Sequence, residues 1–145
     1  MSVVRKSLVA LAAVAVCAIA PLRAAAPETG QLKVTVEYKG PGTVDNSHQI
    51  FVWVFDTPDI SASTEPISSD VITANGGAAS FSGLPKTVYL AAAYNEKGTY
   101  DGTQGPPPTG TPVTIYGGMG TATAVATGGA EAAVTITFDD STRMP

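Results

Sequence analysis

The chain has 145 residues, of which 44% are hydrophobic and 14% charged, and its formal net charge is −4. The first 26 residues contain three of the eight basic residues and no acidic one, so the other 119 residues carry a formal charge of −7. This acidic balance excludes nucleic-acid binding through phosphate neutralisation, which needs clustered Lys and Arg. The length excludes a multi-domain body and is that of one domain with a buried core.

Residues 1–26 have the pattern of a cleaved secretory signal peptide. Arg5 and Lys6 precede an apolar run over residues 8–20, and three alanines at 24–26 suit cleavage. The run is short for a bilayer span, so we expect no stable membrane span after cleavage and a secreted or periplasmic location. The only cysteine, Cys17, lies in this run; a lipidation site there is the alternative, which the branched residues before it disfavour.

Residues 27–145 are predicted to form a single all-β domain. Alternation with period two recurs between turn signals, and no stretch shows sustained helical periodicity. Six to eight short strands, most simply seven, in this many residues indicate a β-sandwich.

The first two predicted strands differ in pattern. Residues 32–39 alternate between apolar and polar side chains, which predicts one buried and one solvent-facing side. Residues 50–55 are apolar at every position, so both faces of this strand should be covered, as in a central strand. We expect Trp53, in this strand, to lie in the core.

The middle of the chain contains a predicted hairpin. A weaker strand at 67–73 leads to Asn75-Gly76, a dipeptide suited to a tight hairpin turn, and residues 78–82 follow as the partner strand. Residues 88–94 have no polar face and predict a second central strand.

Two strands, at 121–126 and 133–138, are predicted to close the domain. The core should include several apolar side chains from different strands. Those expected to be mostly buried are Val34, Val52, Val54, Leu84, Leu90 and Val134.

A long segment rich in Gly and Pro, residues 95–120, connects the central strand to the closing strands. Connections of this length are usually functional or disordered. Because both predicted central strands are apolar on both faces, we expect the segment to fold back over the second face of Trp53. The alternative is a mobile loop beside a face that a partner protein buries.

Several motifs resemble the carboxypeptidase regulatory-like domains. The run at 71–85 reads VITANGGAASFSGLP, a Tyr-Leu-Ala-Ala-Ala strand follows at 89–93, and GQLKV at 30–34 is similar to the opening strand of these domains. The resemblance spans roughly residues 30–94 and implies their prealbumin-like (transthyretin-like) sandwich, an Ig-like two-sheet architecture. It implies a fold rather than an activity.

In this resemblance Phe81 and Leu84 would fill the core and Pro85 would end the strand. The glycine that commonly follows the proline is absent, and Lys86 stands in its place. Collagen-adhesin modules of similar fold carry an isopeptide cross-link, to which Lys33 and Asp139 could be mapped. Lys33 lies on the polar side of its strand, which disfavours the bond.

His48 is the only histidine, and no cysteine follows residue 26. Nucleophile–base pairs of the Ser/His or Cys/His kind and zinc or copper sites therefore lack ligands. We expect no catalytic residue and no cofactor. Calcium is the remaining alternative, with Asn95 and Asp101 as its weak candidates, because oxygen-bearing side chains alternate there; Lys97 opposes it.

Aromatic and polar side chains around the long segment form the candidate ligand site. Aromatic rings can stack on sugar rings, and nearby polar groups can bond hydroxyls. The candidates are Tyr94, Asn95, Tyr100, Asp101, Gln104 and Tyr116.

Together these features predict an exported, non-catalytic binding or structural module of the cell envelope, with a glycan or an envelope protein as partner. The alternative is a divergent carboxylate-dependent hydrolase. That enzyme would need two acids converging in a concave pocket.

Overall fold

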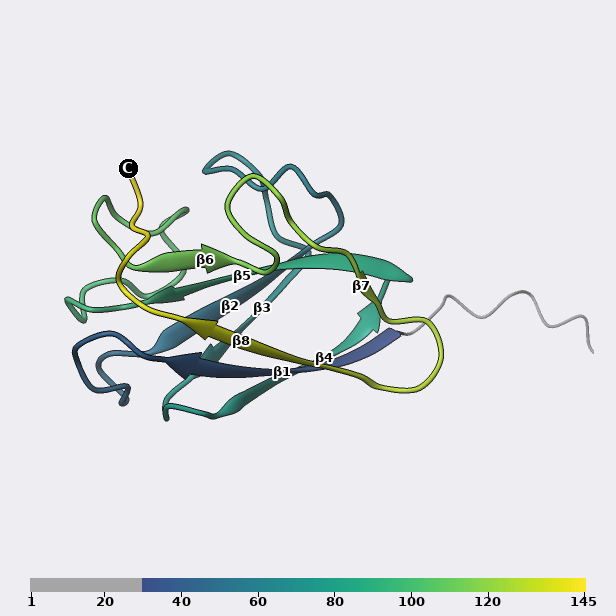
Figure 1. The fold of residues 1–145 in the computed structure, drawn as a ribbon, viewed down its shortest axis with the longest axis horizontal. Helices are drawn as coiled ribbons and strands as arrows, with labels where there is room; N and C mark the ends of the chain where they lie inside the picture. The colour runs from purple at the N-terminus through teal and green to yellow at the C-terminus, as the bar shows by residue number, and fades with distance from the viewer. Residues whose placement is uncertain (1–29) are drawn as a thin grey trace, which may run out of the picture.

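The computed structural model describes residues 30–145, which form two β-sheets and no helix (Figure 1). The expected signal peptide and Cys17 lie outside the described residues. Residues 30–145 contain no helix long and apolar enough to cross a membrane. The strands are β1 (Gly30–Tyr38), β2 (Ile50–Phe55), β3 (Ser68–Ile72), β4 (Ala78–Leu84), β5 (Thr87–Tyr94), β6 (Val113–Ile115), β7 (Val125–Ala126) and β8 (Ala132–Phe138).

The first sheet has the order β4-β1-β8, and the second has the order β3-β2-β5-β6, with β7 paired to β5. β1 runs antiparallel to β4 and parallel to β8, in unbroken register from Leu32 opposite Ala132 to Tyr38 opposite Phe138. The two ends of the described chain therefore meet in one sheet. This all-β, two-sheet arrangement agrees with the predicted sandwich.

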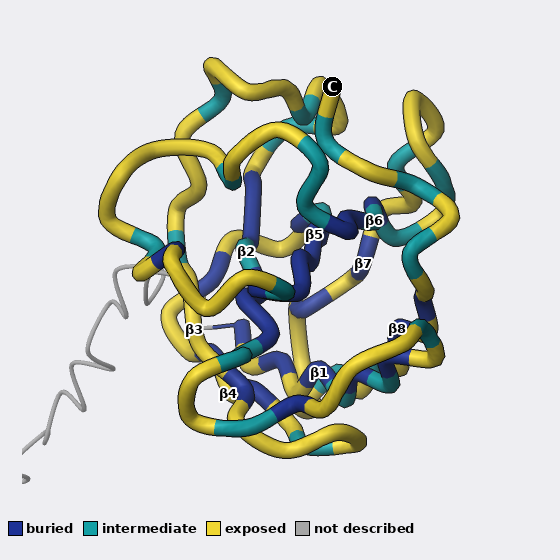
Figure 2. The backbone as a smooth tube through the Cα atoms, turned by 90° about the vertical axis from the view of Figure 1, so that its left-hand side faces the viewer, coloured by how far each residue is buried: buried dark blue, intermediate teal, exposed yellow. Residues whose placement is uncertain are grey.

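The core lies between the sheets, where the strands are buried in Figure 2. β1 alternates as predicted, with its apolar residues inward and its polar residues outward. Val34, Val52, Val54, Leu84 and Leu90 are buried, as predicted. Val134 is only half-buried, because β8 lies at the edge of its sheet, and it packs against the rim of the core.

Both predicted central strands are confirmed, since β2 lies between β3 and β5, and β5 lies between β2 and β6. Their outer faces carry a second apolar cluster built on Phe55, Ala91 and Ile115. Trp53 packs against this outer cluster and is half-buried. The expectation that Trp53 lies in the core between the sheets is therefore wrong.

The predicted hairpin at Asn75-Gly76 is also wrong. β3 pairs with β2 in one sheet, whereas β4 pairs with β1 in the other, so the turn carries the chain between sheets. Gly76 does adopt the expected positive φ, +77°. The dipeptide signals the backbone turn, but it does not determine which sheet the next strand joins.

The predicted strand at 121–126 is reduced to the two residues of β7. β6 instead lies inside the segment predicted as one long connection, and Val113 and Ile115 pair with Ala93 and Ala91. A strand of three residues is too short to show an alternating pattern in the sequence.

Candidate functional site at the loop end of the sandwich

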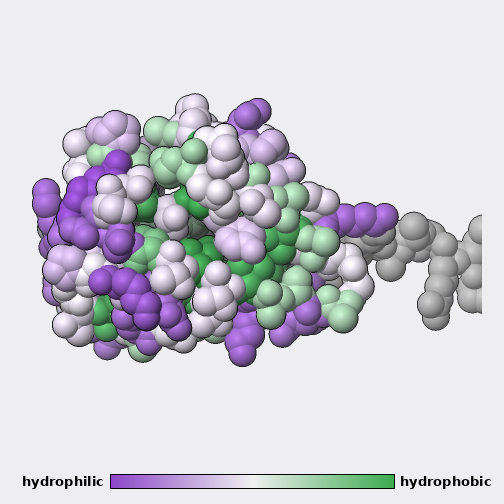
Figure 3. All heavy atoms as spheres, in the orientation of Figure 1, coloured by the Kyte–Doolittle hydropathy of each residue, from purple (hydrophilic) through white to green (hydrophobic). Residues whose placement is uncertain are grey.

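Two connections, residues 39–49 and 95–112, meet the tail after β8, residues 139–145, at one end of the sandwich, which we call the loop end. The Asn95 N–H donates to the Gln49 carbonyl at 2.9 Å, and the Val113 N–H donates to the Thr142 carbonyl at 3.0 Å, which ties the three together. Hydrophilic side chains gather at this end of the molecule, on the left in Figure 3. Five of the six predicted ligand-site residues lie on these connections or at the end of β5. Tyr116 lies farther away, after β6, where its N–H donates to the Leu90 carbonyl at 2.9 Å.

Tyr100 anchors the first part of the long segment to the outer face of β2. Its ring meets Phe51 edge-on, with centroids 4.9 Å apart, and lies 6.3 Å from the ring of Trp53. Its hydroxyl donates to the Gly105 carbonyl at 2.6 Å. The segment therefore folds back over β2, as predicted. Tyr100 is only 4% exposed, so the expectation that it offers a free ring to a sugar is wrong.

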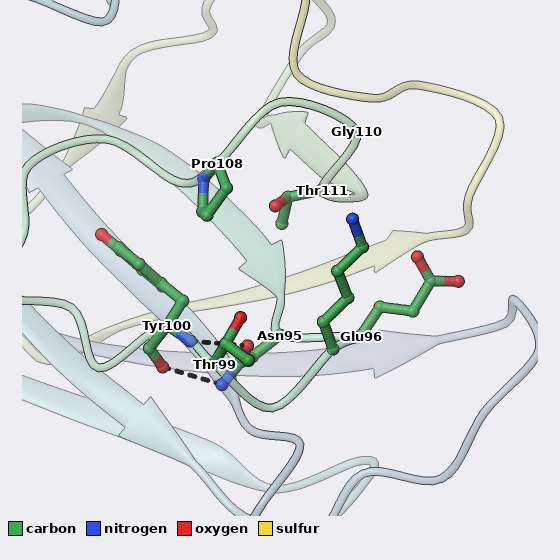
Figure 4. A pocket seen from close by; sticks show the side chains of 8 residues that line it. Asn95, Glu96, Thr99, Tyr100, Pro108, Gly110 and Thr111 are labelled. Atoms are coloured by element: carbon green, nitrogen blue, oxygen red, sulfur yellow. Dashed lines mark hydrogen bonds between the residues drawn. The ribbon is translucent and has the colours of Figure 1, made fainter.

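Asn95 holds the backbone of Tyr100 in place (Figure 4). The Asn95 side-chain amide donates to the Tyr100 carbonyl at 2.8 Å, and its oxygen accepts from the Tyr100 N–H at 3.2 Å. Asn95 is buried, and these bonds use both ends of its amide. Its role is structural, because a buried backbone needs such partners.

Tyr94 belongs to the core. Its ring packs against Tyr38 across the two sheets, with centroids 4.2 Å apart, and its hydroxyl donates to the Thr43 carbonyl at 2.9 Å. Tyr94 is 2% exposed, which contradicts its prediction as a stacking platform. Tyr116 is half-buried and packs against the rim of the core, so it keeps part of its surface free.

Asp101 and Gln104 are exposed, as a contact site requires. The Asp101 carboxylate accepts from the Thr103 N–H at 2.9 Å and from the Thr103 hydroxyl at 2.8 Å. These hydrogen bonds lower the pKa of Asp101. The carboxylate thus stays ionised and shapes a tight turn at the tip of the loop.

The two weak calcium candidates have other partners, Tyr100 for Asn95 and Thr103 for Asp101. Within residues 30–145, no group of three or more His, Cys, Asp or Glu side chains could hold a metal ion.

Arg143 forms a charged clamp that the sequence analysis missed. Its guanidinium donates to Glu96 at 2.7 Å, to Asp140 at 3.1 Å and to the Gly110 carbonyl at 2.7 Å. One side chain thus joins the segments after β5, before β6 and after β8. A lone Arg beside Asp139-Asp140 was the only signal of it, and it did not reveal the distant Glu96.

Arg143 is the ion-pair partner of both Glu96 and Asp140. Glu96 and Asp140 converge, as a hydrolase would require, but they converge on a cation. Arg143 holds the pKa of Glu96 below its ordinary value. A general acid needs a raised pKa, so the lowered pKa of Glu96 favours a structural role for this carboxylate.

The C-terminal tail also pairs with the segment before β6. The backbones of Arg143 and Pro112 form an isolated antiparallel β-bridge. Beside it, the Met144 N–H donates to the Thr111 carbonyl and the Gly110 N–H donates to the Met144 carbonyl, each at 2.9 Å. The tail therefore borders β6 and fixes the second end of the long connection.

Tyr38 lies beneath this tail with its hydroxyl buried and without a hydrogen-bond partner among the described residues. Burial, with the nearby charges of Asp140 and Glu96, raises the pKa of Tyr38 to about 12. The phenol therefore stays neutral at physiological pH.

A small hollow lies between the two halves of the long segment, lined by Asn95, Glu96, Tyr100, Pro108 and Thr111 (Figure 4). It has room for about one water molecule. A sugar ring cannot enter it, so any ligand at the loop end must be held by the outer surface. Glu96 extends from the hollow toward the C-terminal segment, drawn in yellow.

Comparison of the chain with protein-family models, curated proteins and solved structures found no match.

Proposed function

We propose that this protein is an exported, non-catalytic recognition module of the cell envelope, built on a prealbumin-like sandwich, which binds a protein partner through residues 101–109. The observation that carries this proposal is the anchoring of an exposed loop tip by the buried Tyr100.

The loop is fixed at both ends but exposed between them. Tyr100 and Asn95 hold its start, and the tail holds its end through Gly110 and Met144. Asp101, Gln104 and Pro106 lie exposed in the stretch between. A loop already ordered before binding loses little conformational entropy when it binds, which favours affinity.

The chemistry of the tip suits a protein surface better than a sugar. Stacking on a sugar needs a free aromatic face, and both Tyr94 and Tyr100 are buried. Exposed prolines, an amide and a carboxylate instead offer a stiff contour with a few polar contacts.

The fold assignment within this proposal rests on the motif at residues 71–85. Phe81 and Leu84 are 6% and 2% exposed, and Pro85 follows the last residue of β4. These are the roles that the resemblance implies for them.

Site-specific photo-crosslinking in the producing cell tests the binding surface. A photoreactive residue at Gln104 should give a discrete protein adduct, whereas the same residue at the exposed Glu65, on a different loop, should not. Equal adducts at both positions, or none at Gln104, would count against the loop. Binding on a glycan array that disappears in Tyr116→Ala would replace the protein partner with a sugar.

Export is tested separately. Deletion of residues 2–26 should leave the protein in the cytoplasm, and mass spectrometry of the natural protein should find the signal segment removed. A cytoplasmic, uncleaved natural protein would overturn this part of the proposal.

A further inference from the structure

β8 presents an unprotected edge. In the described part of the chain it pairs only with β1, and its seven residues, AAVTITF, include no charge, Pro or Gly. Figure 2 places it at the rim of the molecule. A long, regular, uncharged edge of this kind is a template for pairing with another strand.

The other sheet edges are better protected. β3 carries the charged Asp70, and β6 is bordered by the C-terminal tail. β4 is broken by Gly83, at φ +68°, and its register with β1 shifts near Gly30. Irregularities and charges of these kinds oppose edge-to-edge pairing.

The open backbone groups of β8 follow from its pairing with β1. The Lys39 N–H donates to the Phe138 carbonyl at 2.8 Å, so the polar groups of Phe138 face β1. Since these groups alternate along a strand, those of Ala133, Thr135 and Thr137 face the open side.

An apolar strip runs beside this edge. Ala132, Val134 and Tyr116 are partly buried against the rim of the core. Figure 3 shows apolar side chains exposed between β8 and β6 in the view of Figure 1. A strand added to β8 would cover this strip and complete its hydrogen bonds.

We propose that the added strand is β8 of a second copy, antiparallel to the first, with the two-fold axis at Thr135. Strand β8 is complementary to itself in this arrangement. In this register Thr135 faces Thr135, Val134 faces Ile136, and the small Ala132 faces the large Phe138. No charge lies within the paired strands, so two acidic chains can meet there.

The resulting dimer has one six-stranded sheet, and residues 101–109 lie outside its paired strands. This inference does not rest on the proposed function. The same register sets Glu131 opposite Asp139 just beyond each end of the paired strands. Because like charges repel and salt screens them, added salt should tighten the dimer.

Sedimentation velocity over a wide concentration range, with the protein as the cell processes it, tests the inference. The wild type should show a concentration-dependent monomer–dimer equilibrium. Thr135→Lys places two cations against each other at the axis and should weaken the dimer by about 100-fold or more. Thr135 is exposed, so the monomer should keep its circular dichroism spectrum and melting temperature.

The matched control is Thr35→Lys. Thr35 is the β1 neighbour of Thr135 on the same face, but it does not meet its own copy across the axis. Thr35→Lys should therefore keep the dimer, and Ser80→Lys, on β4, should do so too. A wild type that stays monomeric overturns the inference. Loss of the dimer in Ser80→Lys with retention in Thr135→Lys overturns it in favour of the β4 edge.

Discussion

The side-chain amide of Asn75 takes the place of a strand partner for Tyr38. The Tyr38 N–H donates to Asn75 Oδ1 at 2.8 Å, and Asn75 Nδ2 donates to the Tyr38 carbonyl at 2.8 Å. β4 begins only at Ala78, so without Asn75 these two groups at the end of β1 would lack a partner on that side. The turn thus links the two sheets and also extends the ladder of β1.

Asn75→Ala should lower the free energy of unfolding by about 1–3 kcal/mol, because two hydrogen bonds are lost at the end of β1. Asn75→Asp should be similarly destabilising at neutral pH, since its carboxylate cannot donate to the Tyr38 carbonyl. Urea unfolding measures both effects. Thr73→Ala, at an exposed position just before the turn, is the control and should change little. A stability equal to that of the wild type in Asn75→Ala would mean that water replaces the amide without cost.

The sequence predicted which strand faces are buried, but it did not predict which strands are neighbours. Period-two alternation correctly predicted the two faces of β1, and the lack of a polar face correctly predicted the central positions of β2 and β5. These patterns carry no information about which strands pair with one another. The parallel pairing of β1 with β8, and the crossing from β3 to β4, depend on contacts between distant segments.

Part of the candidate site was also predicted from the sequence, and part was not. Apolar residues on both faces of β2 predicted that the long segment would fold over it, and the segment does. The sequence did not show that Tyr100 would be the residue that covers this face, because an aromatic beside a Gly-rich loop fits an anchor and a ligand platform equally well. The Arg143 clamp depends on one side chain reaching Glu96, 47 residues away in the chain, which no local pattern records.

Truncation of Tyr100 should therefore affect stability. Tyr100→Ala removes a buried ring from Phe51 and Trp53 and should cost about 3–5 kcal/mol. Tyr100→Phe keeps the ring and loses only the bond to the Gly105 carbonyl, which should cost about 1 kcal/mol. Thermal and urea unfolding measure both. If Tyr100→Ala melts with the wild type, the ring does not anchor the loop.

Core packing between the sheets is tested at Leu90, which is 0% exposed on the central strand β5. Leu90→Ala should cost about 2–5 kcal/mol through the cavity it leaves. Val71→Ala is the matched control, since Val71 is 42% exposed on β3 and its truncation opens no cavity. Equal losses for the two variants in urea unfolding would contradict the two-sheet core.

The Arg143 clamp should make a pH-dependent contribution to stability. Hydrogen bonding from Arg143 lowers the pKa of Glu96 in the folded protein. The folded state therefore binds this proton less readily than the unfolded state, and the stabilisation is present above the ordinary carboxyl pKa of about 4.3. As the pH falls through the folded pKa, Glu96 becomes protonated and the contribution is lost.

Glu96→Gln should accordingly be less stable than the wild type at neutral pH and equally stable in strong acid. The difference should be small and should shrink with salt, because the pair is exposed. The control is Glu65→Gln, at an exposed loop position without an ion pair among the described residues, which should leave the stability at neutral pH unchanged. Urea unfolding of the three proteins across the acid range gives the measurement, and a Glu96→Gln deficit that persists unchanged in acid would place its cause outside the ion pair.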